Sequence, residues 1–186
     1  MLDALPVLSE AHLADGYRRA EFGSAWADTD GNGCNQRDDV LFRDAAPGYE
    51  VTIATQGACD HDVIAGTWRD AYSGRLLTFT NLKDQAQAQA IQIDHVVSLS
   101  DAWETGAWAW TRDERIMFAN DLGNLLAVDG PTNQAKSDAG PPDWLPDVDG
   151  CRYVQQYVQV KASYGLGVTE WSVGGLRAIL SQCAPA

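Results

Sequence analysis

IQIDHVVSLSDAW, residues 91 to 103, places Asp94 and His95 side by side at the end of an apolar run that predicts a buried strand. Further along the chain, NLLAVD (124–129) predicts a second short strand, and GPTNQAKSD (130–138) predicts a short helix that begins at its proline. Two titratable groups are costly to place at the end of an apolar strand unless they have partners. The pair therefore indicates a chemical role, with partners supplied by the second strand and the helix.

The side chains in these three segments suit the hydrolysis of a phosphodiester bond. A histidine has an ordinary pKa of about 6.5, so we predict that His95 is the general base that takes a proton from water. Asn124 can accept a hydrogen bond from the His95 ring without adding charge, and we expect it to orient that ring. Asp94 and Asn133 offer hard oxygen ligands, which suit one Mg²⁺ or Mn²⁺ ion. Lys136, one helical turn after Asn133, is expected to contact the phosphate.

Each of these five residues also has a structural interpretation. His95 could be a hydrogen-bonded core residue, and Asp94 could bind a backbone amide. Asn124 could cap a turn, Asn133 could cap the short helix, and Lys136 could be solvated surface. His12 and His61 lie in no comparable pattern, and we interpret both as structural.

The spacing of DH, then NL, then N-x-x-K resembles the ββα-metal (HNH) nuclease motif. Longer stretches are similar to the C-terminal HNH domain of GmrSD-type restriction endonucleases and to related exported bacterial HNH nucleases; they include GNGCNQRDDVL, WRDAYSG, DHVVSLSDAWETGAWAW, FANDLGNLLAVDGPTNQAKSD and DWLP. The resemblance implies an α+β fold with a ββα-metal (His-Me finger) core at about 89–140. That core would be embedded in a single domain, 1–186, with additional short antiparallel strands and flanking helices.

The remaining elements are predicted from periodicity and turn residues. SEAHLADGYRRAEFG predicts a helix that starts at Ser9 and stops at Gly23, and residues 25–39 read as an ordered loop. Antiparallel strands are expected at YEVTIAT, DVIAGTW and RLLTFT, and helices at TRDERIMFAND, CRYVQQYVQVKASYG and VTEWSVGGLRAILSQC. The last two helices would form a hairpin.

Four cysteines occur as two separated pairs without the spacing of a zinc site. Of the three possible connectivities, pairing near neighbours closes the shortest loops, and it joins Cys34 to Cys59 and Cys151 to Cys183. Disulfides indicate an oxidising compartment, so we expect a secreted protein whose signal peptide has been removed. Reduced core cysteines in a cytosolic protein are the alternative.

The charge of the chain argues against non-specific attraction to polyanions. Thirteen basic and 26 acidic residues give a net charge of −13, so an anionic substrate needs a local basic patch or bound cations. Arg37, Arg69, Arg75 and Arg115 are candidates for such a patch. No run approaches the roughly 18 apolar residues of a membrane span, and we expect no membrane contact.

The stretch DTDGNGCNQRDD, residues 28 to 39, fits a calcium-binding loop in part. Asp28, Asp30, Asn32 and Asp39 occupy positions 1, 3, 5 and 12 of an EF-hand-type loop, with Asp in place of the usual Glu. The same composition is equally typical of a tightly turned loop. Structural Ca²⁺ is therefore one of two interpretations.

Three tryptophans, Trp103, Trp108 and Trp110, could stack on bases or sugars, but their spacing is more typical of a core. The predicted function is a metal-dependent endonuclease that cleaves DNA, or RNA, with little sequence preference and acts as a monomer. An immunity protein as partner is left open. The alternative is a secreted, non-enzymatic calcium-binding module that recognises a glycan or a protein.

Overall fold

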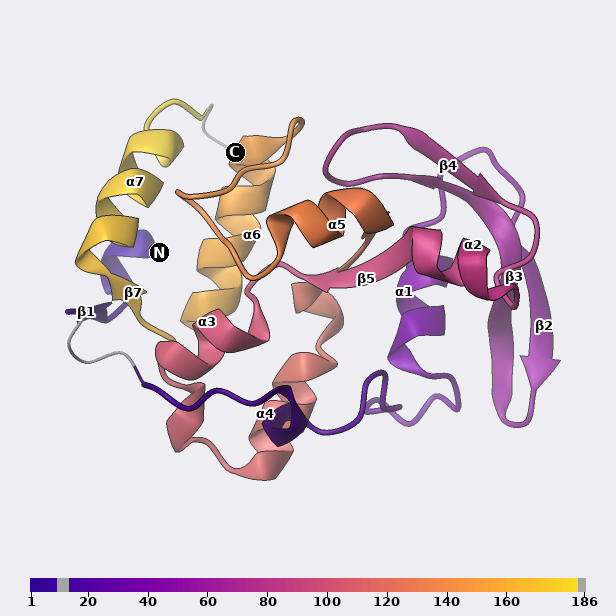
Figure 1. Ribbon diagram of the computed structural model, residues 1–186, viewed down its shortest axis with the longest axis horizontal. Helices are drawn as coiled ribbons and strands as arrows, with labels where there is room; N and C mark the ends of the chain where they lie inside the picture. Colours follow the sequence, from indigo (N-terminus) through magenta and orange to yellow (C-terminus); the bar gives the residue numbers. More distant parts are fainter. Residues whose placement is uncertain (10–13, 184–186) are drawn as a thin grey trace.

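The computed structural model describes residues 1–9 and 14–183, and the fold is α+β. Its centre is an antiparallel pair of strands, β5 (Ile91–His95) and β6 (Leu125–Asp129), with Ile91 opposite Asp129 and His95 opposite Leu125. Helix α5 (Gly130–Lys136) follows β6 directly and packs against both strands (Figure 1). The predicted order of strand, insertion, strand and helix is confirmed.

Local sequence explains how α5 begins. The Asp129 side chain accepts a hydrogen bond from the backbone N–H of Thr132, and Pro131 occupies the first turn, where its missing N–H costs nothing. Because α5 starts as soon as β6 ends, its residues are carried back over the strand pair. This connection places Asn133 near the end of β5.

A three-stranded antiparallel sheet lies at one end of the molecule, in the strand order β2-β3-β4 (Figure 1). Its strands are β2 (Thr52–Gln56), β3 (Cys59–Arg69) and β4 (Leu76–Phe79), which confirms the three predicted strands. Trp68 of β3 is fully buried and donates from Nε1 to the carbonyl oxygen of Leu41. A hydrophobic cluster that includes Trp68, Val40 and Ile93 joins this sheet to the central strand pair.

Helices occupy the other end of the molecule. The two C-terminal helices are α6 (Gly150–Ser163) and α7 (Glu170–Leu180), and the 3-10 helix η1 (Leu2–Ala4) packs against both. The insertion between β5 and β6 in the chain forms α3 (Leu99–Glu104), η4 (Ala107–Ala109), α4 (Arg112–Ala119) and η5 (Leu122–Asn124). Short strands β1 (Val7–Leu8) and β7 (Val168–Thr169) pair in parallel and hold the N-terminal segment against this end.

Both predicted disulfides are confirmed. Cys34 joins Cys59, and Cys151 joins Cys183. The first bond links the loop before helix α1 (Gln36–Arg43) to the start of β3, and the second closes the C-terminal helical hairpin. Each bond restricts the unfolded chain and so stabilises the folded one.

Two expectations about helices were wrong. The loop predicted over 25–39 gives way at Gln36 to α1, because Asn35 accepts hydrogen bonds from two backbone N–H groups of the first turn. Within the described residues, the helix predicted from Ser9 is only the 3-10 turn η3 (Arg19–Phe22); His12 lies outside the described residues. Helices α2 (Gln85–Ala90) and α3 form in stretches that lacked a clear apolar period.

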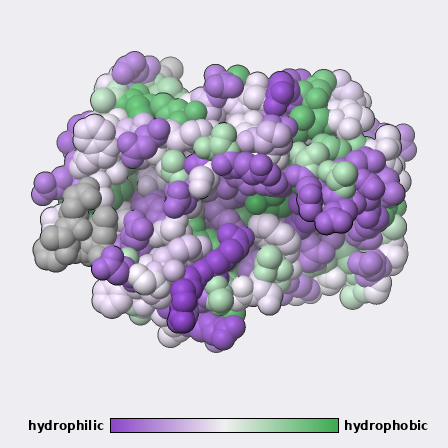
Figure 2. Space-filling view, viewed as in Figure 1, coloured by the Kyte–Doolittle hydropathy of each residue, from purple (hydrophilic) through white to green (hydrophobic). Residues whose placement is uncertain are grey.

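The face of the molecule that carries α5 is mostly hydrophilic, and its hydrophobic residues form separate patches (Figure 2). None of the helices within the described residues is both long enough and apolar enough to cross a membrane.

Candidate active site

The end of β5 and the middle of α5 meet at one open pocket of about 420 Å³. Asp94, His95 and Asn133 line it, as predicted from their spacing, and Arg19 and Trp26 line it as well. The two N-terminal residues come from a segment far away in sequence. The site therefore combines the strand pair and α5 with the chain that precedes α1.

His95 is held as a neutral ring. It is 6% exposed, and its Nε2 lies 2.8 Å from the carbonyl oxygen of Ala119. Since a carbonyl oxygen can only accept, Nε2 carries the hydrogen and Nδ1 keeps a lone pair. Burial is the main cause of a lowered pKa of about 4 for His95, and the charges of Arg19 and Lys136 act in the same direction. At neutral pH the ring can accept a proton.

Asn124 does not orient the His95 ring, so that expectation was wrong; the carbonyl oxygen of Ala119 occupies the predicted position. Asn124 is fully buried, and its side chain binds the backbone of Val97 twice. Oδ1 accepts from the Val97 N–H at 2.8 Å, and Nδ2 donates to the Val97 carbonyl at 3.1 Å. Asn124 thereby joins the segment after β5 to the segment before β6, and it fixes His95 through the backbone.

Lys136 is not a surface residue that could reach a phosphate, so its predicted role was also wrong. Its side chain is fully buried, and Nζ lies 2.9 Å from Asp94 Oδ2 and 3.1 Å from the carbonyl oxygen of His95. The Tyr72 hydroxyl donates to the same Asp94 oxygen. Lys136 and Tyr72 together fix the orientation of the Asp94 carboxylate from inside the protein.

This arrangement leaves hard oxygen atoms at the pocket. The Asn133 amide donates from Nδ2 to Gln92 Oε1 at 2.9 Å, so its Oδ1 is left as an acceptor for another group. Among the described residues, none hydrogen-bonds to Asp94 Oδ1 or Asn133 Oδ1. One carboxylate oxygen and one amide oxygen, with room for water, fit Mg²⁺ or Mn²⁺ better than a soft metal.

Sequence analysis missed the arginine that lies beside His95. Arg19 is exposed and lines the pocket. Arg37 also lines it, but its guanidinium donates to the carbonyl oxygens of Ala88 and Ile91. The other candidates bind protein groups elsewhere: Arg69 to Gly74, Arg75 to Asp129, and Arg115 to Trp110. No local motif marks Arg19, which lies within the stretch that was predicted to be a helix.

Trp26 was also missed. Its ring stacks on His95, with centroids 5.9 Å apart and planes 19° apart. Its φ is +59°, a left-handed conformation that is rare for a bulky residue and costs on the order of 1–3 kcal/mol. The surrounding fold stabilises this conformation, and as a result one face of the His95 ring is covered.

The three tryptophans of the insertion divide between core and surface. Trp103 and Trp110 pack against the main hydrophobic cluster, and Trp110 lies edge-on to Phe118 at 5.4 Å. Trp108 is 56% exposed. A core role is confirmed for two of the three.

The loop that resembles a calcium site uses its side-chain oxygens locally. The Asp28 carboxylate accepts from the backbone N–H groups of Gly31 and Gly33, and Asn32 Oδ1 accepts from the N–H of Cys34. Asp30 accepts from the N–H of Asn32. These bonds are typical of a tightly turned loop. The calcium ion stays a prediction.

Two comparisons with known proteins found a match. The family model described as the C-terminal domain of GmrSD restriction endonucleases matches residues 37–171. A protein of Arthroderma benhamiae, described as an uncharacterized secreted protein, is 38% identical over 173 residues, which cover 91% of this chain and 76% of that protein. The secreted relative and the two disulfides are consistent with an extracellular location. No solved structure matches. The chain belongs to the family of the C-terminal domain of GmrSD restriction endonucleases.

Proposed function

We propose that the protein is an endonuclease that hydrolyses phosphodiester bonds of DNA, with His95 as general base and one Mg²⁺ or Mn²⁺ ion at Asp94 and Asn133. One observation carries the proposal. A buried, neutral histidine shares an open pocket with two hard oxygen atoms that have no hydrogen-bond partner among the described residues. In this proposal, β5, β6 and α5 form the ββα-metal core.

His95 would take the proton of the attacking water on Nδ1. The hydrogen bond from Nε2 to Ala119 and the stacked ring of Trp26 hold the imidazole in one orientation, which a general base requires. A pKa of about 4 makes the isolated ring a weak base. An anionic phosphate beside the ring favours its protonated form and so raises its basicity when substrate is bound.

Asp94 and Asn133 would hold the cation. When bound, a divalent cation supplies positive charge that stabilises the phosphoryl oxygens and the departing sugar oxygen. Lys136 and Tyr72 both bind Asp94 Oδ2, and these contacts keep the other carboxylate oxygen directed to the pocket. Lys136 is thus a positioning residue in this proposal.

Arg19 supports a phosphate substrate because it brings an exposed positive charge to the pocket. The net charge of the whole protein, −13, opposes general attraction to nucleic acid. Recognition would therefore depend on contacts at the scissile phosphate, which is the same in every sequence. We therefore expect cleavage with low sequence preference. We also expect the protein to be a monomer and to be exported with the help of a signal peptide.

A plasmid-nicking assay with Mg²⁺, Mn²⁺ or EDTA tests the function. Loss of a general base costs roughly 10²- to 10⁴-fold in rate, so His95→Ala should lose that much. Asn133→Ala should raise the metal concentration needed for half-maximal rate, and Arg19→Ala should weaken substrate binding at unchanged metal demand. Asp94→Asn removes a proposed metal ligand. Its matched control is Asp113→Asn, because Asp113 is an exposed carboxylate on α4; this control should cleave normally.

Two results would contradict the proposal. The enzyme assignment is wrong if no metal supports cleavage of plasmid DNA or of an RNA of similar length. Cleavage that survives His95→Ala in a folded variant would remove His95 as the base.

A further inference from the structure

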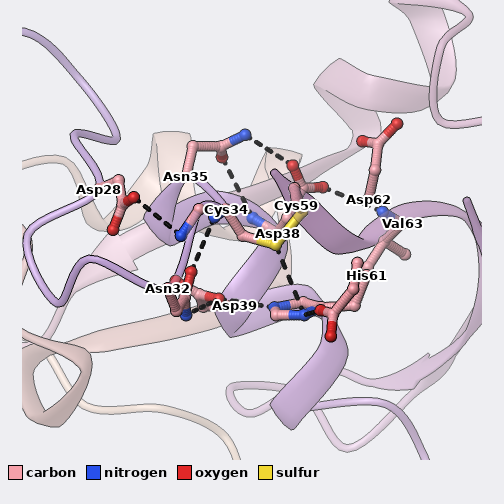
Figure 3. Close-up of a disulfide and its surroundings, with 12 residues drawn as sticks. Asp28, Asn32, Cys34, Asn35, Asp38, Asp39, Cys59, His61, Asp62 and Val63 are labelled. Carbon is pink, nitrogen blue, oxygen red and sulfur yellow. Dashed lines mark hydrogen bonds and ion pairs between the residues drawn. A yellow bond between two sulfur atoms is a disulfide. The ribbon is translucent and has the colours of Figure 1, made fainter. Parts of the chain in front are cut away.

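A second cluster of metal-ligating side chains surrounds the Cys34–Cys59 disulfide (Figure 3), and Cys34, Cys59 and His61 do not line the pocket of His95. His61, two residues after Cys59 on β3, places its Nδ1 3.4 Å from the Cys34 sulfur. The two sulfurs and a ring nitrogen of His61 all lie within 4.8 Å of one another. The proposed catalysis does not use these residues.

The His61 ring is oriented as a metal-ligating histidine is. Its Nε2 lies 2.7 Å from Asp39 Oδ1, and Asn32 Nδ2 donates to the same oxygen at 2.9 Å (Figure 3). Asp39 is 7% exposed, so this carboxylate is fixed inside the protein. A carboxylate on the far nitrogen holds the near nitrogen toward a metal and raises its basicity. Here the near nitrogen faces sulfur.

The distances match a tetrahedral zinc site. Bonds of about 2.3 Å to sulfur and about 2.05 Å to nitrogen separate the two ligand atoms by about 3.5 Å at a tetrahedral angle. Cys34 Sγ and His61 Nδ1 are already 3.4 Å apart. The two sulfurs, bonded in the disulfide, have to separate, which requires rotation of the cysteine side chains after the S–S bond is broken. His61 Nδ1 also lies 2.6 Å from Asp60 Oδ1, and the Asp60 side chain is 87% exposed; this carboxylate has to turn away into solvent before Nδ1 can bind a cation.

Contacts other than the disulfide keep the two cysteines close. Asp38 Oδ1 accepts from the backbone N–H of Val63 at 3.1 Å, and its other oxygen accepts from Asn35 Nδ2 at 2.6 Å. These bonds tie the first turn of α1 to β3 (Figure 3). Cleavage of the S–S bond therefore leaves Cys34 within reach of Cys59.

We propose that Cys34, Cys59 and His61 form a redox-gated site for Zn²⁺ or a similar borderline-soft divalent cation. A dithiol reductant supplies two electrons and two protons and becomes a cyclic disulfide, while the Cys34–Cys59 bond becomes two thiols. The cation then displaces one proton from each thiol and the Nδ1 proton of His61, and it binds two thiolates, Nδ1 and a water molecule. In the reverse exchange a cyclic disulfide takes up the two electrons and two protons and becomes a dithiol, which releases the ion and restores the Cys34–Cys59 bond.

Cobalt absorption tests this site in the full chain with Cys151→Ser and Cys183→Ser, so that only one cysteine pair remains. After reduction and removal of the reductant under anaerobic conditions, one equivalent of Co²⁺ should give the thiolate-to-cobalt charge-transfer band and the visible bands of tetrahedral Co²⁺. Zn²⁺ should abolish both. His61→Ala should change the visible bands and weaken binding, and Asp39→Asn should weaken it roughly 10- to 100-fold.

Asn133→Ala, which removes a ligand of the proposed catalytic cation, should leave the cobalt spectrum unchanged, because that cation has no thiolate ligand; this control separates the two metal sites. The oxidised protein should give no charge-transfer band. Far-ultraviolet circular dichroism of each variant, oxidised and reduced, verifies the fold, and His61→Gln replaces His61→Ala if that variant unfolds. The proposal is overturned if the folded, reduced protein gives no charge-transfer band, or gives one that both His61 variants leave unchanged.

Discussion

Replacing Lys136 with methionine is expected to lower the free energy of unfolding by about 3 kcal/mol. The side chain is fully buried, and its ammonium lies 2.9 Å from Asp94 Oδ2. Removing one partner of a buried ion pair costs about 3–5 kcal/mol, because the other charge stays buried without compensation. The lower end applies here, since Asp94 keeps the Tyr72 hydroxyl and borders an open pocket. Methionine has nearly the volume of lysine, so the cavity contribution is small.

Urea unfolding at pH 7 in EDTA measures this loss without interference from bound metal. Asp94→Asn in the Lys136→Met background should recover much of it, with a coupling free energy of about 2–3 kcal/mol in the double-mutant cycle. Arg177→Met is the control, because its ion pair with Asp3 is exposed at both side chains and should contribute little to stability. The reasoning is refuted if Lys136→Met costs no more than Arg177→Met, or if Asp94 and Lys136 show no coupling.

Three further predictions concern Asn124, His61 and Trp26. Asn124→Ala should lower the free energy of unfolding by about 2 kcal/mol, since it removes two buried hydrogen bonds to Val97. It should also slow cleavage at saturating metal. Urea unfolding that shows no measurable difference in stability from the unchanged protein would contradict this. Partial burial opposes protonation of His61, but hydrogen bonds and charges from Asp39 and Asp60 outweigh it and raise its pKa. His61 therefore contributes fully to stability below its unfolded pKa of about 6.5, and this contribution is lost as the pH rises through the higher pKa of the folded state. His61→Gln should flatten this part of the curve of stability against pH, and an equal slope in both proteins would refute the prediction. Trp26→Leu should lower kcat and change KM less, because it releases the His95 ring, whereas Trp26→Phe should retain most of kcat. Equal losses of kcat in the two variants in steady-state assays would argue against stacking.

Some of the wrong expectations have a common physical cause. Asn124 and Lys136 were assigned from their spacing, and both do lie at the site, but neither makes the predicted contact. Spacing fixes where the backbone of a residue falls; packing decides whether its side chain points into the pocket or beneath it. A buried lysine and an exposed lysine look alike in sequence.

The sequence by itself determined the order of elements around Asp94 and His95, because the apolar runs, the cap at Asp129 and the proline that follows are local signals. It also favoured, among three possible connectivities, the disulfide pairing that the structure shows, since neighbouring cysteines close the shortest loops. Only the tertiary structure decided which groups surround the histidine. Ala119, Trp26 and Arg19 come from two segments on either side of β5 in sequence, and no periodicity encodes contacts that exist only after the chain has packed.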